Sequence, residues 1–304
     1  MEKIKPAFQK NSVPICFSAN DNYVPMLATE IASIIDHANA EKNYDIVILT
    51  TEISDENKVK LLSLIARHAN FSIRFVNVSP YIYGYNFYIE SDIFSTKYSD
   101  EIYFRILAPA IMADYDHVIF LDADLIVLDD ISKLLDFADN SKLVSAVRDY
   151  EGIANCYNNN YERTKYRISE LGITNFDDYF ISGVLVINNA LFNERFNTKE
   201  LLDMAVSKNW KQYDQDLLNY LCKESVNIID AEWDFVEDIY DIYHSMPKKL
   251  FKEFEESEKA PKIIHYSGAR KPWKRTTSKY NKHFWKYAEQ TAFYDELKSK
   301  IKDD

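Results

Sequence analysis

The N-terminal part of the sequence alternates between strand-like and helix-like patterns, and this alternation restricts the fold more than any other feature. Residues 13–18 and 44–49 are apolar runs typical of buried strands, and residues 71–78 alternate with period two. Apolar residues recur at helical spacing over 24–35, and Ser54 can cap a second helix before the third strand. Strands and helices in this order predict right-handed βαβ units on a parallel sheet.

The rest of the chain continues the α/β pattern and becomes mainly helical after residue 189. We expect a helix over 100–113 that Pro109 bends or ends, and a buried strand over 117–121. Residues 150–179 are polar and rich in tyrosine, which favours a loop or short helices near the open edge of the sheet. Further strands are expected at 143–147, 180–187, 226–230 and 262–265. In the earlier helix that follows Ser54, we expect Val59, Leu62 and Ile65 to face inward.

Composition excludes several classes of protein. With 304 residues, 47% of them hydrophobic, the chain can bury a substantial core, and its formal charge of −12 argues against nucleic-acid binding. No apolar run reaches the roughly 18 residues that span a bilayer, and residues 1–12 lack the apolar core of a secretory signal. Three widely spaced cysteines imply neither a disulfide framework nor a cysteine metal site. We therefore expect a globular protein of the cytoplasm.

Asp122 and Asp124 form the most informative motif, in the segment FLDADL. Two carboxylates interrupt an apolar run at the end of a predicted buried strand, where uncompensated charge is unfavourable. The carboxyl ends of strands face the ligand crevice of an open α/β sheet, and one small residue between the acids lets both approach one divalent cation. The alternative is that either aspartate caps the next segment or pairs with a surface base.

A second candidate segment follows the strand expected at 262–265. His265 could supply a nitrogen ligand to the same cation, and Gly268 allows a close backbone approach. Lys271, which precedes Pro272 and Trp273, could neutralise a phosphate. The alternative is a core histidine followed by an ordinary surface turn.

Other polar groups could belong to the same site. Residues 212–216 (QYDQD) suit sugar hydroxyls and a developing cationic carbon, or only complement a helix dipole. Residues 20–23 (NDNY) lie at a βα turn, where they could hold a base and ribose or cap the next helix. Arg105 could snorkel to solvent or turn toward the crevice. Gly183 indicates either the close approach of a ligand or strand, or a simple bulge.

Taken together and in this order, these segments resemble glycosyltransferase family 8 (GT8), the bacterial galactosyl- and glucosyltransferases that build surface polysaccharides. The resemblance covers residues 13–275 and rests on FSANDNY, YDIVILT, YFRILAP, FLDADLIVLDDISKLL, YFISGVLVIN, YDQDLLN and HYSGARKPW. It implies a GT-A fold, an α/β architecture with a Rossmann-like, mixed and mostly parallel sheet flanked by helices. It also implies a Mn²⁺-dependent (or Mg²⁺-dependent), retaining transfer of a hexose from UDP-glucose or UDP-galactose to a saccharide or lipid-linked acceptor.

The resemblance also assigns roles to residues by their positions. It implies metal ligands at Asp122, Asp124 and His265. It implies donor contacts at Ala19 (by its backbone, near uracil), Asp21, Asn22, Arg105 and Ala123, and pyrophosphate contacts at Gly268 and Lys271. It implies sugar-side residues at Asp149, Asp214, Gln215 and Asp216, and we expect the catalytic residues to be Gln215, Asp214, Asp216 and Lys271.

Ile181 departs from the family pattern, which usually has asparagine at this place in YFISG. The departure favours an alternative, a catalytically weak or inactive relative that binds nucleotide-sugars. A further alternative is a protein that glycosylates one of its own 22 tyrosines. Aromatic packing explains the high tyrosine content more simply. A metal-dependent nucleotidyltransferase would need a triphosphate loop, against which the count of only five glycines argues.

The sequence predicts one GT-A domain over residues 1–275 and a helical tail over 276–304. Lysines of the tail alternate with aromatic residues and could rest on the anionic inner face of a membrane. The alternative is a terminal helix packed on the domain with a solvated lysine face, since acidic residues offset most of the charge. The tail lysines are Lys279, Lys282, Lys286, Lys298, Lys300 and Lys302.

Overall fold

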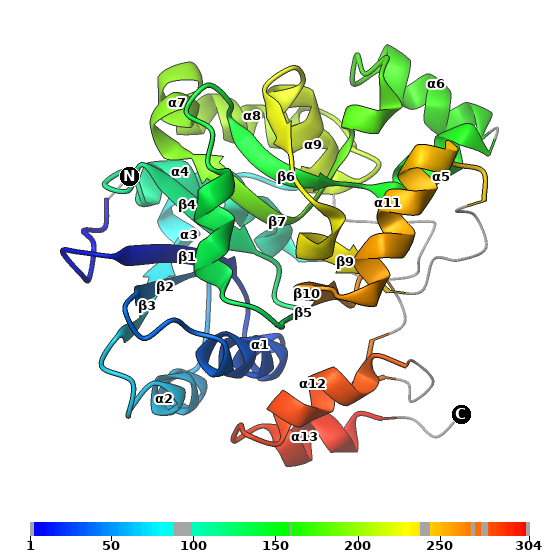
Figure 1. Cartoon of the computed structure of the whole chain (residues 1–304). Helices are drawn as coiled ribbons and strands as arrows, with labels where there is room; N and C mark the ends of the chain where they lie inside the picture. The colour runs from blue at the N-terminus through cyan, green and yellow to red at the C-terminus, as the bar shows by residue number, and fades with distance from the viewer. Residues whose placement is uncertain are drawn as a thin grey trace.

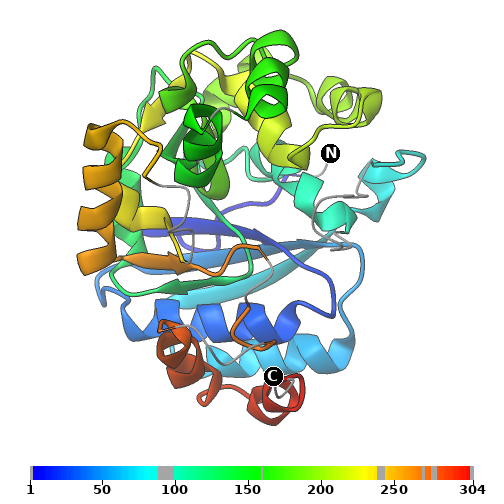
Figure 2. The same ribbon diagram turned by 90° about the vertical axis from the view of Figure 1, so that its right-hand side faces the viewer.

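The predicted α/β architecture is confirmed by the structure, a computed structural model that describes residues 3–87, 99–158, 160–237, 244–268, 271–274 and 279–301. A seven-stranded sheet lies between two layers of helices (Figures 1 and 2). Its strands are β1 (Ser12–Ser18), β2 (Asn43–Thr50), β3 (Phe71–Asn77), β4 (His117–Leu121), β6 (Val144–Arg148), β7 (Phe180–Asn188) and β8 (Val226–Ile228).

The strand order of the main sheet is β3-β2-β1-β4-β7-β6-β8. The strands β3, β2, β1 and β4 are mutually parallel, as the alternating pattern predicts. Strand β7 is antiparallel to both of its neighbours, β4 and β6. The carboxyl end of β4 therefore meets the amino end of β7, and the Asp122 N–H donates to the Gly183 carbonyl at 2.9 Å. This meeting point positions the candidate site.

A separate three-stranded sheet explains how distant segments meet. It consists of β5 (Leu125–Val127), β10 (Ile263–His265) and β9 (Phe235–Val236), in the order β5-β10-β9. In the antiparallel pairing of β10 with β5, His265 lies opposite Leu125. Because Leu125 directly follows Asp124, this register brings the histidine beside the carboxylate pair.

The helices form two layers, each with its own hydrophobic core. One layer holds α1 (Val24–Asp36), α2 (Asp55–Leu64), α12 (Asn281–Ala288) and α13 (Tyr294–Ser299), which Figure 2 shows on one side of the sheet. The opposite layer holds α3 (Ser79–Ile82), η1 (Asp100–Leu107), α4 (Ala108–Ile111), α7 (Asn189–Arg195), α8 (Thr198–Ser207) and α9 (Tyr213–Cys222). The remaining elements are η2 (Ile131–Phe137), α5 (Tyr150–Tyr157), α6 (Tyr161–Ser169), η3 (Phe176–Asp178), η4 (Ala231–Asp234) and α11 (Lys248–Lys259).

Two details of the predicted elements are wrong. Ser54 caps α2 as predicted, but Val59 and Leu62 are 66% and 42% exposed, and Leu61 is the residue that the helix buries. A helical spacing of apolar residues therefore identified the helix but not the face that packs. The helix expected over 100–113 is a 3₁₀ helix, η1, followed by the short α4, with Pro109 in the first turn of α4, where its missing N–H is tolerated.

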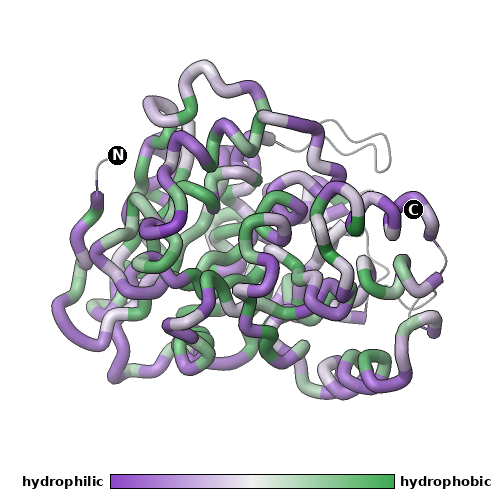
Figure 3. Tube along the Cα trace, turned by 90° about the horizontal axis from the view of Figure 1, so that it is seen from above, coloured by the Kyte–Doolittle hydropathy of each residue, from purple (hydrophilic) through white to green (hydrophobic). Residues whose placement is uncertain are grey.

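Hydrophobic stretches gather in the interior of the fold, and hydrophilic residues dominate the outer turns (Figure 3). Cys16, Cys156 and Cys222 are all buried and unpaired. Among the described residues, no helix combines the length and apolar character that crossing a membrane requires.

The described part of the tail packs on the first helix layer, where α12 contacts α1. Several of its lysines pair with acidic groups: Lys286 with Asp36 at 3.0 Å and Lys300 with Glu296 at 2.7 Å. Lys279 likewise pairs with Glu258. Lys302, Asp303 and Asp304 lie outside the described residues, as do Ala269 and Arg270 of the HYSGARKPW segment.

Candidate functional site

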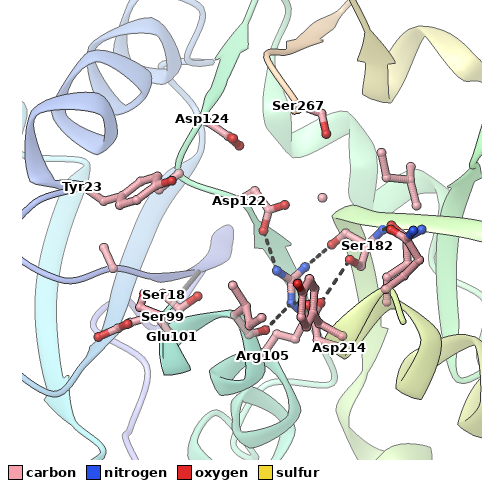
Figure 4. A pocket seen from close by; sticks show the side chains of 18 of the residues that line it. Ser18, Tyr23, Ser99, Glu101, Arg105, Asp122, Asp124, Ser182, Asp214 and Ser267 are labelled. Carbon is pink, nitrogen blue, oxygen red and sulfur yellow. Dashed lines mark hydrogen bonds and ion pairs between the residues drawn. The ribbon is translucent and has the colours of Figure 1, made fainter. Parts of the chain in front are cut away.

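Asp122 and Asp124 project into a cavity of about 210 Å³ at the carboxyl end of β4 (Figure 4). Asp122 directly follows the strand and Asp124 directly precedes β5, so the backbone turns between the two acids. The cavity is lined by Ser18, Ala19, Asn20, Tyr23, Ser99, Glu101, Ile102, Arg105, Asp122, Ala123, Asp124, Ile181, Ser182, Gly183, Lys211, Gln212, Tyr213, Asp214, Gln215, His265 and Ser267.

His265 completes a group of three side chains that could hold a metal ion. Its Nε2 lies 3.3 Å from Asp124 Oδ1 and 3.9 Å from Asp122 Oδ2. One potential ligand atom from each residue lies within 4.8 Å of the others. Asp124 Oδ1 is buried and accepts no hydrogen bond from the described residues, which leaves it available as a ligand. Two carboxylate oxygens and one imidazole nitrogen suit Mn²⁺ or Mg²⁺, so the residues present fit a divalent cation.

Asp234, at the end of η4, orients the imidazole of His265. Its Oδ1 lies 2.8 Å from His265 Nδ1, and its carboxyl group is fully buried. A proton on Nδ1 that is shared with this carboxylate leaves Nε2 facing Asp122 and Asp124. Burial opposes protonation of His265, but the charges of Asp234 and Asp124 raise its pKa well above the ordinary value. Asp234 belongs to none of the sequence motifs, and the local signal for this residue is an acid between Trp233 and Phe235.

Gly183 leaves room for the same imidazole. A Cβ atom at this position would lie 2.4 Å from His265 Cε1 and 2.7 Å from His265 Nδ1. Real Cβ atoms essentially never approach other atoms this closely, so a side chain here would displace the imidazole. The close approach expected at Gly183 is therefore that of a side chain from β10.

Arg105 turns inward, and its side chain is only 4% exposed. Its guanidinium pairs with Asp122 Oδ1 at 2.6 Å and with Asp214 Oδ2 at 2.8 Å, and it donates to the Ser182 carbonyl (Figure 4). These bonds fix both carboxylates on one side of the cavity. Burial raises the pKa of Asp214 to about 6, although the Arg105 charge opposes this shift.

Lys271 contacts Asp124 but is not among the residues that line the cavity. Its Nζ pairs with Asp124 Oδ2 and donates to the Tyr266 carbonyl at 2.5 Å. Burial alone would raise the pKa of Asp124, but the charges of Lys271 and His265 outweigh it and hold this pKa well below the ordinary value. The structure therefore brings Asp122, Asp124, His265 and Lys271 together as predicted.

The helix start at α9 contributes Asp214 and Gln215 to the cavity, but not Asp216. The Gln215 amide is held at both ends: Oε1 accepts from Ser182 N at 3.2 Å, and Nε2 donates to Asp149 Oδ2 at 3.0 Å. Asp216 is buried and lines no cavity described here. It accepts hydrogen bonds from Tyr166 OH, Tyr179 OH and Gln212 N at 2.9, 2.6 and 2.7 Å.

The turn after β1 lines the cavity with residues other than the expected ones. Asp21 accepts hydrogen bonds from Ser54 and Asn57 near the start of α2, and Asn22 is exposed. Ala19 lines the cavity as expected. Asn20, Tyr23, Ser99 and Glu101 also line it, and the Asn20 side-chain amide donates to Ser99 Oγ at 3.2 Å and to Glu101 Oε2 at 3.3 Å.

The remaining expected residues lie close to the cavity. Asp149 lines a second, adjoining cavity and caps α5 by accepting from Gly152 N at 2.8 Å. Gly268 has a φ of +75°, which favours glycine, but Ser267 is the residue of this turn that lines the cavity. Ile181 lines both cavities.

The sheet, the carboxylate pair at its edge and the second sheet together define a GT-A glycosyltransferase architecture. The structure is similar to that of a WbbM bifunctional glycosyltransferase, with a TM-score of 0.85 and 29% identity over 98% of this chain and 53% of the other. The galactosyltransferase LgtC, solved with donor and acceptor sugar analogues, shares the fold, with a TM-score of 0.74 and 24% identity over 95% of this chain and all of the other.

The family model described as Glycosyl transferase family 8 matches residues 14–277, and the chain belongs to this family. Among curated proteins, the chain is 25% identical to general stress protein A of Bacillus subtilis (strain 168), over 90% of this chain and 92% of that protein. It is also 25% identical to the lipopolysaccharide 1,2-glucosyltransferase of Escherichia coli (strain K12), over 85% and 72%. Family membership implies a transferase that uses a nucleotide-sugar donor, usually with a divalent metal ion, and a saccharide acceptor.

Proposed function

We propose that this protein transfers a hexose from UDP-glucose or UDP-galactose to a saccharide acceptor, with retention of configuration, in surface polysaccharide synthesis. The observation that carries the proposal is the convergence of Asp122, Asp124 and His265 in the cavity of a family 8 chain. The names of the lipopolysaccharide glucosyltransferase and of the galactosyltransferase LgtC support a hexose donor and a glycan product. The chain spans about half of the WbbM protein, so the proposal concerns the transferase unit alone.

The carboxylates Asp122 and Asp124 and the imidazole of His265 would hold a divalent cation. When bound, this cation would act as a Lewis acid on the donor diphosphate. Arg105 and Lys271 each occupy one oxygen of the carboxylate pair, so the acids are oriented before any ligand arrives.

Lys271 would stabilise the leaving group. The bond between the anomeric carbon and the diphosphate oxygen breaks, and its electron pair stays on that oxygen. The ammonium group pairs with Asp124, one of the residues that would hold the cation, and it would offset the growing negative charge. This interaction is stronger in the departing state than in the bound donor, so it would lower the barrier rather than only tighten binding.

The side chains expected beside the donor sugar favour attack by the acceptor on the anomeric carbon from the same face that the leaving group occupies. Gln215 is fixed by Ser182 and Asp149, so its amide could support a positively charged anomeric carbon through its dipole but is a weak nucleophile. Asp214 is tied to Arg105 and is also not free to form a covalent intermediate. The acceptor oxygen would then bond to the anomeric carbon, and its proton would pass to the departing phosphate oxygen.

A release assay with a panel of UDP-hexoses, with and without Mn²⁺, tests this function. We expect Mn²⁺-dependent UDP release from one donor, an Asp124→Ala variant that folds but lacks this release, and a product whose anomeric configuration, read by NMR, matches the donor. Binding of UDP without turnover of any donor would contradict the proposal. That result would favour the catalytically inactive relative, the alternative that Ile181 suggests.

The location of the reaction is a further part of the proposal. We place the transferase domain at residues 1–275 and the tail at 276–304. We also place the enzyme in the cytoplasm. There the tail could contact the inner face of the membrane and lipid-linked acceptors. The ion pairs of Lys286 and Lys300 within the protein leave less positive charge for this contact. Salt-sensitive co-sedimentation with anionic vesicles tests the contact, and its absence would remove it from the proposal.

A further inference from the structure

A second cavity, of about 70 Å³, adjoins the candidate metal cavity. Ile181, Gln212, Gln215 and Ser267 line both cavities, so these residues form a shared wall. The wall is fixed, because the Gln215 amide bonds to the Ser182 backbone on one side and to Asp149 on the other. A molecule in the second cavity would therefore lie directly beside one in the first.

Elements far apart in the sequence form the sides of the second cavity. It is lined in part by residues of β6, α5, β9 and α11. The Arg148 guanidinium pairs with Glu253 at 3.3 Å, and the Tyr150 ring lies 5.8 Å from the ring of Phe254. Phe254 in turn stacks on Phe235 at 5.5 Å. The cavity therefore has an apolar aromatic floor between two packed elements.

The charges around the second cavity are mostly negative. Asp149, Glu151 and Asp234 line it, and Arg148 is the only lysine or arginine among the described lining residues. Arg148 is already engaged, by Glu253 and by its hydrogen bond of 2.9 Å to the Asp177 carbonyl. Arg148 is therefore not free to pair with an anionic ligand, and the nearby Arg167 pairs with Asp149 at 3.5 Å.

Glu151 differs from the other two acids of this cavity in the hydrogen bonds of its carboxyl group. Asp149 accepts from Gln215 and Gly152, and Asp234 is bonded to His265. The carboxyl group of Glu151, in the first turn of α5, accepts no hydrogen bond from the described residues and is half-buried. Burial and the nearby Asp149 charge raise the pKa of Glu151, although the charges of Arg163 and Arg167 oppose this shift.

We propose that the second cavity binds the acceptor sugar and that Glu151 selects a neutral or amine-bearing sugar over an anionic one. This inference rests on the proposed function. The hydroxyl groups of a sugar ring are donors that Glu151 can accept, and the C–H face of the ring can pack on the aromatic floor. A carboxylate or phosphate on the acceptor would meet like charges in a partly desolvated space, where Arg148 and Arg167 are already engaged by Glu253 and Asp149.

The test separates donor chemistry from acceptor recognition. UDP release from the active UDP-hexose without an acceptor requires only the first cavity, and the same assay with methyl glycosides, lactose, glucosamine or glucuronic acid reports on the second. We expect the neutral and amine-bearing sugars to accelerate UDP release and glucuronic acid to have no effect. Glu151→Gln should raise the acceptor KM about tenfold, while the donor KM and the acceptor-free rate stay unchanged.

Two further variants sharpen the result. Glu151→Lys should increase the use of glucuronic acid relative to lactose at least about tenfold, because it replaces the repelling charge with an attracting one. Glu162→Gln changes an exposed glutamate at the equivalent turn of α6 and should behave like the wild type.

An unchanged acceptor KM in Glu151→Gln, equal use of glucuronic acid and lactose by the wild type, or no acceleration by any neutral sugar would each overturn the proposal. If the wild type releases UDP from no UDP-hexose, either with or without an acceptor, the proposed function itself fails.

Discussion

Gly183→Ala offers a severe test of the site geometry, because it adds one methyl group next to the expected metal ligand. The new Cβ would lie 2.4 Å from His265 Cε1, whereas carbon atoms that are not bonded keep about 3.5 Å apart. The imidazole would therefore have to move by about 1 Å. It cannot move freely, because it is 4% exposed and bonded to Asp234 at 2.8 Å.

The size of the effect follows from this displacement. A shift of about 1 Å in a group that positions the reaction can lower a rate on the order of 100-fold. We expect the affinity for Mn²⁺ to fall about tenfold to 100-fold, as when a ligand loses its orientation. The added methyl group should also destabilise the fold by about 1–3 kcal/mol through overpacking.

Calorimetric titration measures the affinity for Mn²⁺, and UDP release from the active donor measures the rate. Thermal unfolding measures the loss of stability. Gly84→Ala is the matched control: it also adds a methyl group at a glycine, one with a φ of +85°, but that group would meet no atom within 4 Å. The control should lose stability through backbone strain and keep its affinity for Mn²⁺. A Gly183→Ala protein with wild-type metal affinity and rate would refute the assigned role of the glycine.

Three other predictions test the surroundings of the site. Asp234→Asn should weaken Mn²⁺ binding about tenfold to 100-fold in calorimetry with little change in secondary structure, and an unchanged affinity would show that Asp234 does not orient His265. Lys271→Ala should raise the transfer barrier by about 2–4 kcal/mol, measured as kcat, and an unchanged kcat would remove Lys271 from the mechanism. Because burial raises the pKa of Asp214 to about 6, kcat/KM should fall as the pH drops below 6, where protonation removes the carboxylate that pairs with Arg105. A profile that stays flat down to pH 5 would contradict a role for the ionised form of Asp214.

The sequence predicts most of the fold because buried strands and packed helices leave periodic marks in it. The run 117–121 followed by two acids is readable as a strand end, and β4 and Asp122 occupy these positions. The exposed side chains of Val59 and Leu62 show that periodicity alone does not identify the buried face of a helix. Spacing along a helix shows that a stripe exists, whereas the neighbours in three dimensions decide which side is buried.

The candidate site is predictable only where its chemistry is local or where a resemblance supplies it. Asp21 and Asp216 illustrate the difficulty, because a carboxylate near a helix start can either face a ligand or accept hydrogen bonds from its own surroundings, and here both do the latter. Asp234 belongs to no motif, since its role comes from the pairing of β9 with β10 that brings it to His265. Long-range pairings of this kind leave no periodic signal.

The proposed metal site can be tested by an anomalous diffraction experiment on crystals of the protein soaked with Mn²⁺ and UDP. We expect one strong manganese peak in contact with Asp122, Asp124 and His265, and with the diphosphate of UDP. A manganese peak elsewhere, or UDP bound in the cavity with no manganese at these three side chains, would contradict the proposed site.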